Sequence, residues 1–234
     1  MIKTYKVLSA LLSYPTADLQ AEAWNMHLAL DTERLLLPRH RAAIAELIDE
    51  IAASDLLDVQ ACYVDLFDRT RALSLHMFEH VHGESRDRGQ AMVDLLKLYE
   101  EGGYTPTPRE LPDFLPLFLE YASTLAPKAA IELIGQPANV IAALRERLAK
   151  RRSPYEAVMA ALLALSRAKL DDAALATLRA EPDPEPDDLE ALDAAWVEQE
   201  VTFGPGTQAA SSCPVDRMAD RLRAAVNPAA GGAS

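Results

Sequence analysis

Three of the five histidines in this chain lie close together, at His76, His80 and His82. Histidine changes its charge near neutral pH, and it is the commonest metal ligand in proteins. The same stretch also carries acidic, basic and glycine residues, namely Glu79, Gly83, Glu84, Arg86, Asp87, Arg88 and Gly89. This mixture is too dense for a plain amphipathic helix, which carries one apolar stripe opposite solvated charges. We therefore expect residues 63–95 to determine what the protein does.

The sharpest chemical pattern in this stretch is HMFEH at residues 76–80, which matches the H-x-x-E-H motif of inverted zinc metalloproteases. In a helix, spacings of three and four would place both histidines and the glutamate on one face, as two metal ligands and a general base require. A third ligand would have to come from Glu100, Asp113 or Glu120. Short motifs also match by accident, and inverted zinc proteases are much larger enzymes. A small zinc metallopeptidase is therefore the alternative function.

Other groups allow both a structural and a functional interpretation. Arg86 and Arg88 could bind an anion, or they could pair with nearby carboxylates. Tyr63, Leu66 and Phe67 follow helical spacing and are by default core residues. The sequence contains no G-x-S-x-G, P-loop or G-x-G-x-x-G motif that a following helix could complete, which argues against these catalytic and nucleotide-binding classes.

The composition indicates an all-helical protein. Half of the 234 residues are apolar but only 6% are aromatic. Alanine and leucine dominate, and they lose little rotamer freedom in a helix. The formal net charge of −13 argues against a nucleic-acid partner, because phosphates attract Lys and Arg. It suits a basic partner, and it also simply aids solubility.

Cysteine spacing and apolar runs limit the location of the protein. Cys62 and Cys213 form no CxxC pair, so neither a zinc knuckle nor a disulfide scaffold is indicated. The longest apolar run, residues 157–165, is far shorter than the roughly 20 residues of a membrane span. The apolar stretch at residues 7–12 is too short for a signal peptide. We expect a cytoplasmic protein that does not insert into membranes.

Apolar spacing, prolines and capping residues predict helices along most of the chain. In the first part these helices cover residues 2–13, a segment after Thr16, residues 39–53, and a segment from Ser54 or Asp55 to Phe67. In the second part they cover residues 88–101 up to Gly102-Gly103, a segment capped by Asp113 with Pro116 in its first turn, segments starting at Pro127 and Pro137, and residues 154–168 behind a capping box at 153–156. The chain is predicted to form a single all-α, helical-bundle-like domain.

The composition changes near residue 179. Residues 181–188, EPDPEPDD, combine proline with acid and cannot enter a helix interior or a core. Residues 181–200 contain nine Asp or Glu and no Lys or Arg. We therefore predict a folded domain over residues 1–178 and an acidic, Pro-rich, disordered tail over residues 179–234. Within the tail, residues 189–197 form an amphipathic turn or two, from which Trp196 could dock on the body.

Several runs of the sequence together resemble one family. These runs are Tyr63-x-x-Leu66-Phe67-Asp68, Leu73-Ser74-Leu75-His76, FEHVHGESRDRGQAM at residues 78–92, and LPDFLPLFLEY at residues 111–121. They look like the NarJ family, the assembly chaperones of respiratory nitrate reductase within the TorD/DmsD group of redox-enzyme maturation proteins. The resemblance covers about residues 1–170, and EHVHGESRDRG is its most specific run.

The resemblance implies a non-enzymatic, all-helical chaperone in the cytoplasm. It would bind the apo catalytic (alpha) subunit of a membrane-bound nitrate reductase, through the N-terminal segment of that subunit and a second region. It would hold the subunit open while molybdenum guanine dinucleotide is inserted, with no cofactor or metal of its own. The predicted client-binding residues are Tyr63, Leu66, Phe67, Asp68, His76, Glu79, His80, His82, Gly83, Arg86, Arg88, Pro112, Asp113, Pro116 and Glu120.

The chemistry of these residues suggests three roles. The apolar group would line or support a groove for a basic amphipathic segment, and it consists of Tyr63, Leu66 and Phe67. The acidic group would meet basic side chains of the client, and it consists of Glu79, Asp113 and Glu120. The polar network that shapes the site would consist of His76, His80, His82, Arg86 and Arg88.

Overall fold

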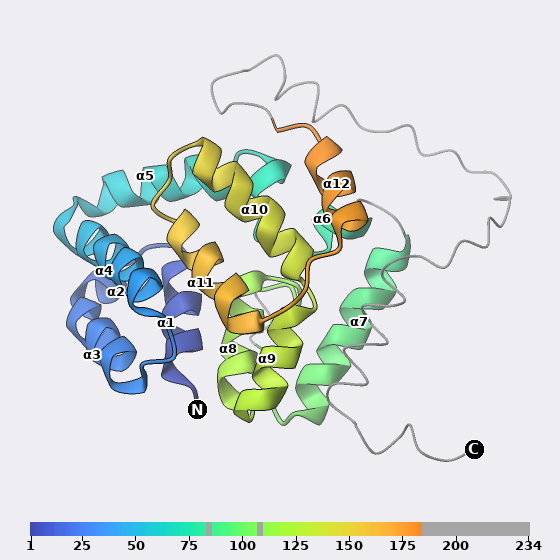
Figure 1. Cartoon of the computed structure of the whole chain (residues 1–234), viewed down its shortest axis with the longest axis horizontal. Helices are drawn as coiled ribbons and strands as arrows, with labels where there is room; N and C mark the ends of the chain where they lie inside the picture. The colour runs from blue at the N-terminus through green and yellow to red at the C-terminus, as the bar shows by residue number, and fades with distance from the viewer. Residues whose placement is uncertain (83–85, 107–109, 184–234) are drawn as a thin grey trace, which may run out of the picture.

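The computed structural model describes residues 1–82, 86–106 and 110–183, and these ranges are mostly helical (Figure 1). They contain twelve α-helices and one 3-10 turn, with an isolated bridge between His76 and Phe114 as their extended pairing. The all-α prediction is confirmed. In chain order the elements are α1 (Lys3–Leu11), α2 (Ala17–Ala21), α3 (Ala23–Glu33), α4 (Pro38–Ala53), α5 (Leu56–Phe67), η1 (Arg71–Leu73), α6 (Glu79–His82), α7 (Arg86–Glu101), α8 (Leu115–Thr124), α9 (Pro127–Gly135), α10 (Ala138–Lys150), α11 (Glu156–Ser166) and α12 (Asp172–Ala180).

The helices surround one hydrophobic core. Helix α1 packs against α8 and α3, and α10 packs against α11 and α12. Helix α11 also contacts α4 and α9, while α9 contacts α8. Figure 1 shows α12 and α7 on one side of the molecule, and α3 on the other. Leu8, Phe118 and Ile141 are among the side chains that have no exposed surface. Because α8 touches both α1 and α9, the position of its first turn affects both halves of the core.

Caps predicted in the first half of the chain are confirmed, although one predicted helix is divided. The Thr16 hydroxyl accepts a hydrogen bond from the Leu19 amide, and the Asp55 carboxylate accepts one from the Leu57 amide. The predicted second helix is interrupted at Glu22, which ends α2 and begins α3. These helix starts follow from local side-chain chemistry, because each cap satisfies an amide that the helix itself leaves free.

Two predicted caps in the second half are wrong. Asp113 does not cap α8, which begins after Phe114. The predicted capping box at 153–156 does not form, because Glu156 pairs with Arg145 at 2.6 Å. Helix α11 therefore begins at Glu156 and not two residues earlier. In both cases a partner that is distant in the sequence takes the carboxylate away from the local backbone.

Several helix ends lie in the left-handed backbone region. Gly103 follows α7 with φ of 72°, a conformation that glycine adopts at no steric cost. Arg34, Arg152 and Arg167 have φ of 50°, 53° and 51°, which costs an ordinary residue roughly 1–2 kcal/mol. Arg34 directly follows α3, and Arg167 directly follows α11. The chain thus changes direction at these arginines.

The last described helix, α12, was not predicted as a separate element. Asp171 caps it by accepting hydrogen bonds from the amides of Ala173 and Ala174. Within the parts of the chain that the structure describes, no helix is long and apolar enough to cross a membrane. Residues 184–234 lie outside these parts, so the disordered tail, the docking of Trp196 and the boundary at residue 178 stay predictions.

We predict that Phe67→Ala lowers the free energy of unfolding by about 3–5 kcal/mol, as removal of a buried aromatic side chain usually does. Phe67 is 4% exposed, and its ring centre lies 4.9 Å from that of Tyr63 and 5.2 Å from that of Tyr155. Leu57→Ala in the same helix is the control, because Leu57 is 72% exposed and should change stability by only about 0.5 kcal/mol. Chemical denaturation measures both values, and similar small losses would contradict the core position of Phe67.

Candidate functional site

Two chain segments that are far apart in the sequence lie side by side at the centre of the predicted site. The Met77 amide donates to the Asp113 carbonyl at 3.1 Å, and the Leu115 amide donates to the Leu75 carbonyl at 2.9 Å. These bonds form an isolated antiparallel bridge immediately before α8. The histidine-rich segment therefore fixes the point at which α8 starts.

The carboxylate of Asp113 is completely buried beside this bridge. Its Oδ2 accepts a hydrogen bond from the Phe78 amide at 3.0 Å, and its Oδ1 lies 3.3 Å from His76 Nδ1. The hydrogen bond with Asp113 raises the pKa of His76 and outweighs the partial burial that would lower it. A buried charge without such partners is strongly unfavourable. Asp113 therefore holds the two segments together.

Glu79 and Arg88 form an ion pair beside the same segment. Arg88 Nη2 donates to Glu79 Oε1 at 3.1 Å, with the side chains 22% and 23% exposed. Burial alone would raise the pKa of Glu79, but the hydrogen bond with Ser74 and the Arg88 guanidinium together lower it. Glu79 begins α6 and Arg88 belongs to α7, so this pair joins the two helices.

His80 connects the histidine-rich segment to the end of the described chain. Its side chain is almost completely buried, and its Nε2 lies 2.8 Å from the Ser74 carbonyl oxygen. A carbonyl can only accept, so Nε2 carries the proton. The other ring nitrogen, Nδ1, lies 3.9 Å from Glu181 Oε2, and this oxygen lies 3.4 Å from Arg147. His80 thus lies between backbone on one side and a carboxylate on the other.

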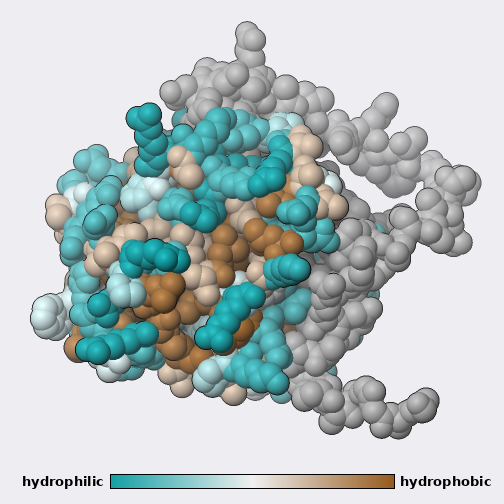
Figure 2. Space-filling model, in the orientation of Figure 1, coloured by the Kyte–Doolittle hydropathy of each residue, from teal (hydrophilic) through white to brown (hydrophobic). Residues whose placement is uncertain are grey.

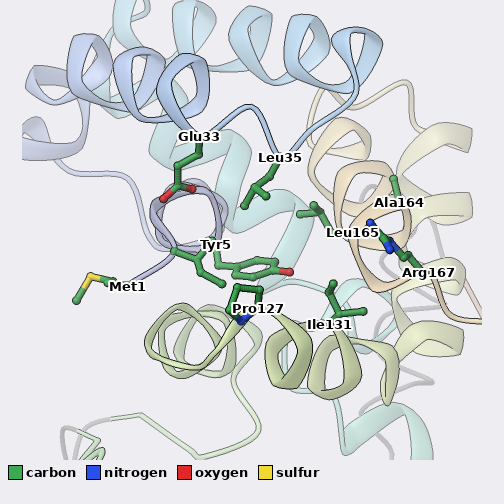
Figure 3. Close-up of a pocket in the computed structure, with 10 residues that line it drawn as sticks. Met1, Tyr5, Glu33, Leu35, Pro127, Ile131, Ala164, Leu165 and Arg167 are labelled. Atoms are coloured by element: carbon green, nitrogen blue, oxygen red, sulfur yellow. The ribbon is translucent and has the colours of Figure 1, made fainter.

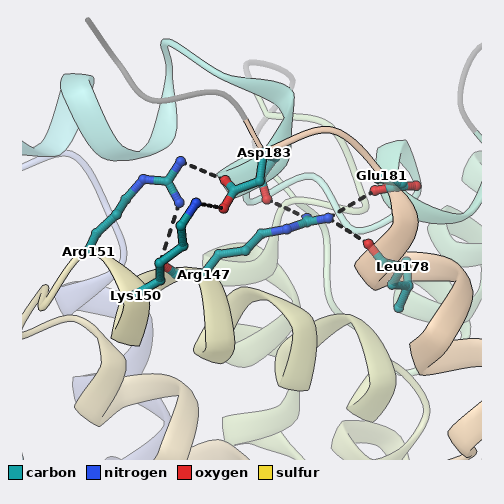
Figure 4. A network of polar contacts seen from close by, with 7 residues as sticks. Arg147, Lys150, Arg151, Leu178, Glu181 and Asp183 are labelled. Atoms are coloured by element: carbon teal, nitrogen blue, oxygen red, sulfur yellow. Dashed lines mark hydrogen bonds and ion pairs between the residues drawn. The ribbon is translucent and has the colours of Figure 1, made fainter. Parts of the chain in front are cut away.

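Sequence analysis missed Arg147, whose side chain is 7% exposed. Its guanidinium donates at 2.7 Å to the carbonyl of Ala72 in η1 and at 2.7 Å to the carbonyl of Leu178 in α12 (Figure 4). Arg147 therefore joins three elements that are distant in the sequence. A signal was present, because Arg147 falls three residues after Leu144 and one before Leu148, on the apolar face of its helix. An arginine on such a face needs internal partners.

The polar network continues to the last described residues. Asp183 forms ion pairs with Arg151 at 2.6 Å and with Lys150 at 3.4 Å (Figure 4). Arg151 is 8% exposed in this pair. Glu181 and Asp183, which the sequence assigned to the acidic tail, thus lie against α10 in the structure.

The arrangement predicted for a zinc site does not form. Helix α6 begins at Glu79, so His76 lies outside it and does not share a helical face with His80. His76 faces Asp113, and His80 faces the Ser74 carbonyl. Among the described residues, no group of three or more His, Cys, Asp or Glu side chains is placed to hold a metal ion. The expectation that HMFEH lies on one helical face is therefore wrong.

The predicted residues of α5 lie in the core. Tyr63, Leu66 and Phe67 are buried, and the Tyr63 hydroxyl donates to the Leu12 carbonyl at 2.8 Å. This confirms their interpretation as core residues. Asp68 is exposed and follows the last residue of the helix.

The remaining predicted residues lie around α6, α7 and α8. The carbonyl of Pro112 accepts a hydrogen bond from the Tyr99 hydroxyl at 2.7 Å. Pro116 is buried in the first turn of α8. For His82 and Arg86 the structure describes only their places at the end of α6 and the start of α7. Gly83 lies outside the described residues.

Glu120 of α8 lines an open groove. The groove has a volume of about 660 Å³ and lies along α1, α2 and α3. Its lining combines apolar and acidic side chains, including Val7, Leu19, Met26, Asp18, Glu22 and Glu120. Sequence analysis did not predict this groove. The available signal was the set of small residues in the first helix, Ser9, Ala10 and Ser13, which leave space beside it.

The predicted network positions one wall of this groove. The Ser9 hydroxyl of α1 donates to the Pro116 carbonyl of α8 at 2.7 Å, so the two helices are joined at the bridge. Farther along α8, Glu120 accepts a hydrogen bond from the Tyr104 hydroxyl at 2.9 Å and lies 3.8 Å from Lys6. The residues near Asp113 thus hold α8, and α8 presents Glu120 to the groove.

This geometry is that of a helical binding protein, in which the ionisable residues satisfy one another and an apolar groove with acidic residues stays open. The chain belongs to the nitrate reductase delta subunit family, whose model matches residues 34–161. The family assignment confirms the resemblance found in the sequence, and with it the expectation of an assembly factor that is not an enzyme.

Three relatives show how far the similarity extends. The chain is 43% identical over 197 residues to the nitrate reductase molybdenum cofactor assembly chaperone NarJ of Escherichia coli (strain K12), covering 84% of this chain and 83% of the relative. It is 39% identical over 224 residues to the probable assembly chaperone NarW of the same strain, covering 95% and 94%. It is 31% identical over 163 residues to the probable chaperone NarJ of Bacillus subtilis (strain 168), covering 69% and 86%.

We predict that Arg147→Ala lowers the free energy of unfolding by about 3–5 kcal/mol, because it leaves two buried carbonyls and Glu181 without their donor. Arg145→Ala in the same helix is the control. Its side chain is 48% exposed and pairs with Glu156, and surface ion pairs contribute at most about 1 kcal/mol. Chemical denaturation measures both variants. Equal losses would show that Arg147 does not join the three elements.

We predict that the stability advantage of the native chain over His76→Asn decreases as the pH rises from about 6 to about 8. Folding raises the pKa of His76 above its ordinary value. The stabilisation is therefore fully present below the unfolded pKa of about 6.5, and it is lost as the pH rises through the folded pKa. Denaturation of both proteins at each pH measures this difference. A constant difference across the range would show that the charge of His76 does not stabilise the bridge.

Proposed function

We propose that this chain is a cytoplasmic assembly chaperone of a respiratory nitrate reductase. It binds the apo catalytic (alpha) subunit, including the N-terminal segment of that subunit, and keeps it accessible while the molybdenum cofactor is inserted. The family membership supports this proposal, as do relatives named as molybdenum cofactor assembly chaperones. The observation that carries it is the open groove with acidic residues along α1, α2 and α3.

The groove suits the apolar face of a basic amphipathic helix. Such a helix presents apolar side chains at spacings of three and four to a hydrophobic groove. Val7 and Met26 supply apolar lining, and the flexible side chain of methionine adapts to different partners. Asp18, Glu22 and Glu120 supply carboxylates to meet Lys or Arg of the bound segment. The net charge of −13 favours the approach of a basic segment from a distance.

In this proposal the predicted site residues act in two ways. Asp113 is completely buried, so it supports binding by holding α8 in place and not by touching the client. Glu79 and Arg88 keep about one fifth of their surface, and they are the proposed contact for a second region of the client. His82, Gly83 and Arg86 are neighbours of this pair in the sequence and belong to the same proposed contact.

We predict that Asp18→Lys combined with Glu22→Lys weakens binding of the N-terminal peptide of the catalytic subunit by about tenfold, because each surface charge pair contributes up to about 1 kcal/mol. Titration of the purified full chain with a labelled peptide measures this. Glu100→Lys combined with Glu101→Lys is the control, since it changes the net charge equally at an exposed end of α7. Cells with the first variant should accumulate nitrate reductase that lacks molybdenum cofactor.

Each other outcome has a defined meaning. Equal weakening by both double variants would show that only the overall charge matters, and the groove would lose its role. Unchanged binding in the first variant would place the peptide elsewhere on the protein. Absence of peptide binding to the native chain, with normal nitrate reductase in cells that lack this chain, would contradict the proposed function itself.

A further inference from the structure

A second cavity lies on another side of α1. It has a volume of about 300 Å³ and is enclosed by parts of α1, α3, α9 and α11 (Figure 3). Its lining is mostly apolar and includes Ile2, Leu35, Pro127, Ile131 and Leu165. Figure 2 shows hydrophobic residues that reach the surface on the face turned to the viewer, interrupted by hydrophilic side chains. Leu35 alone is 47% exposed, so part of this apolar lining faces solvent.

The hydroxyl of Tyr5 points into this cavity (Figure 3). Tyr5 is 2% exposed, and in the described parts of the chain nothing forms a hydrogen bond with its hydroxyl. Burial raises the pKa of Tyr5 and outweighs the opposite effect of Arg167, so the hydroxyl stays protonated at neutral pH. A buried hydroxyl without a partner costs about 1–3 kcal/mol. The cavity therefore offers one polar group to whatever enters it.

Two charged residues also line the cavity, but only one of them has a free charge. Glu33 accepts hydrogen bonds from the amides of Lys3 and Thr4 at 2.6 Å and 2.7 Å, so its carboxylate caps α1. Arg167 lies on the opposite side in Figure 3 and is exposed. Among the described residues Arg167 has no ion-pair partner. The cavity is therefore an apolar site with one available cation and one available hydroxyl.

We propose that this cavity is the docking site of residues 189–196 of the same chain, with Trp196 inserted beside Tyr5 and with the acidic neighbours of Trp196 facing Arg167. Leu189, Leu192 and Trp196 follow one another at spacings of three and four, which places them on one face of a helix. Charge complementarity favours this segment, because residues 181–200 contain nine Asp or Glu and no Lys or Arg.

The chemistry of the indole ring fits the cavity. Tryptophan combines a large apolar surface with one N–H donor, which needs an acceptor when it is buried. The Tyr5 oxygen is such an acceptor. A volume of about 300 Å³ is at the lower end for ligand pockets, and it suits one large side chain. Insertion would also cover the exposed apolar surface at Leu35.

The chain can reach the cavity from its last described residue. Asp183 is held on α10 by Arg151, and about 13 residues separate it from Trp196. An extended chain of that length spans up to about 45 Å, whereas the whole of α12, with 9 residues, is only about 14 Å long. Because the segment is tethered, its effective concentration is on the order of millimolar. Even weak contacts are therefore sufficient for docking.

The test uses the fluorescence of Trp196 in the full-length chain. The sequence has two tryptophans, and Trp24 is 76% exposed, so Trp24→Phe leaves Trp196 as the single reporter without disturbing the core. We expect blue-shifted emission and acrylamide quenching several-fold weaker than for the same protein in denaturant. Adding Arg167→Glu should restore strong quenching, and adding Tyr5→Phe should shift the emission. Arg152→Glu is the matched control, because Arg152 is also exposed, also has positive φ and does not line the cavity.

Three results would overturn the proposal. Trp196 that is fully quenchable in the starting variant would show that it does not dock. Protection that survives both Arg167→Glu and Tyr5→Phe would place Trp196 elsewhere on the protein. Equal release by Arg167→Glu and Arg152→Glu would show a diffuse attraction between the acidic segment and the body. This proposal is independent of the client and of the proposed function.

Discussion

The fold depends on how the buried charge of Asp113 is neutralised. A carboxylate without any exposed surface requires partners, and those available are the Phe78 amide and the His76 ring. Both belong to the histidine-rich segment, so satisfying Asp113 brings that segment against the start of α8. Helix α8 then packs on α1, and the Ser9–Pro116 hydrogen bond joins the two. The groove along α1 therefore has a wall whose position is set by one carboxylate.

A buried charge of opposite sign acts on the other side of the same segment. Arg147 binds backbone carbonyls of η1 and α12, and Glu181 lies between it and His80. The histidine-rich segment is thus held through His76 on one side and through His80 on the other. This explains why residues of catalytic type gather here in a protein of an assembly-factor family. Their hydrogen-bonding capacity is used within the fold, while the apolar groove and cavity are left open for binding.

Local chemistry made most of the helices predictable from the sequence. Thr16 and Asp55 cap helices because their partners lie two or three residues away. The sequence around Asp113 also looks like a local cap, but its actual partner, Phe78, is 35 residues away, and no local rule contains that contact. The HMFEH spacing fits a helical face only if the helix begins before His76, and α6 begins at Glu79. The groove was hidden because it arises from the packing of α1 against α3, not from a motif.

The left-handed arginines have a consequence for how this protein tolerates change. Glycine would occupy φ near +50° without the steric cost that Arg34, Arg152 and Arg167 carry. The fold is therefore not at its stability optimum at these three helix ends. At Arg34 and Arg152 a glycine would relieve the backbone at the expense of a surface charge alone. At Arg167 the same exchange would also remove the cation beside the cavity, so heat resistance and ligand affinity would change in opposite directions at that one position.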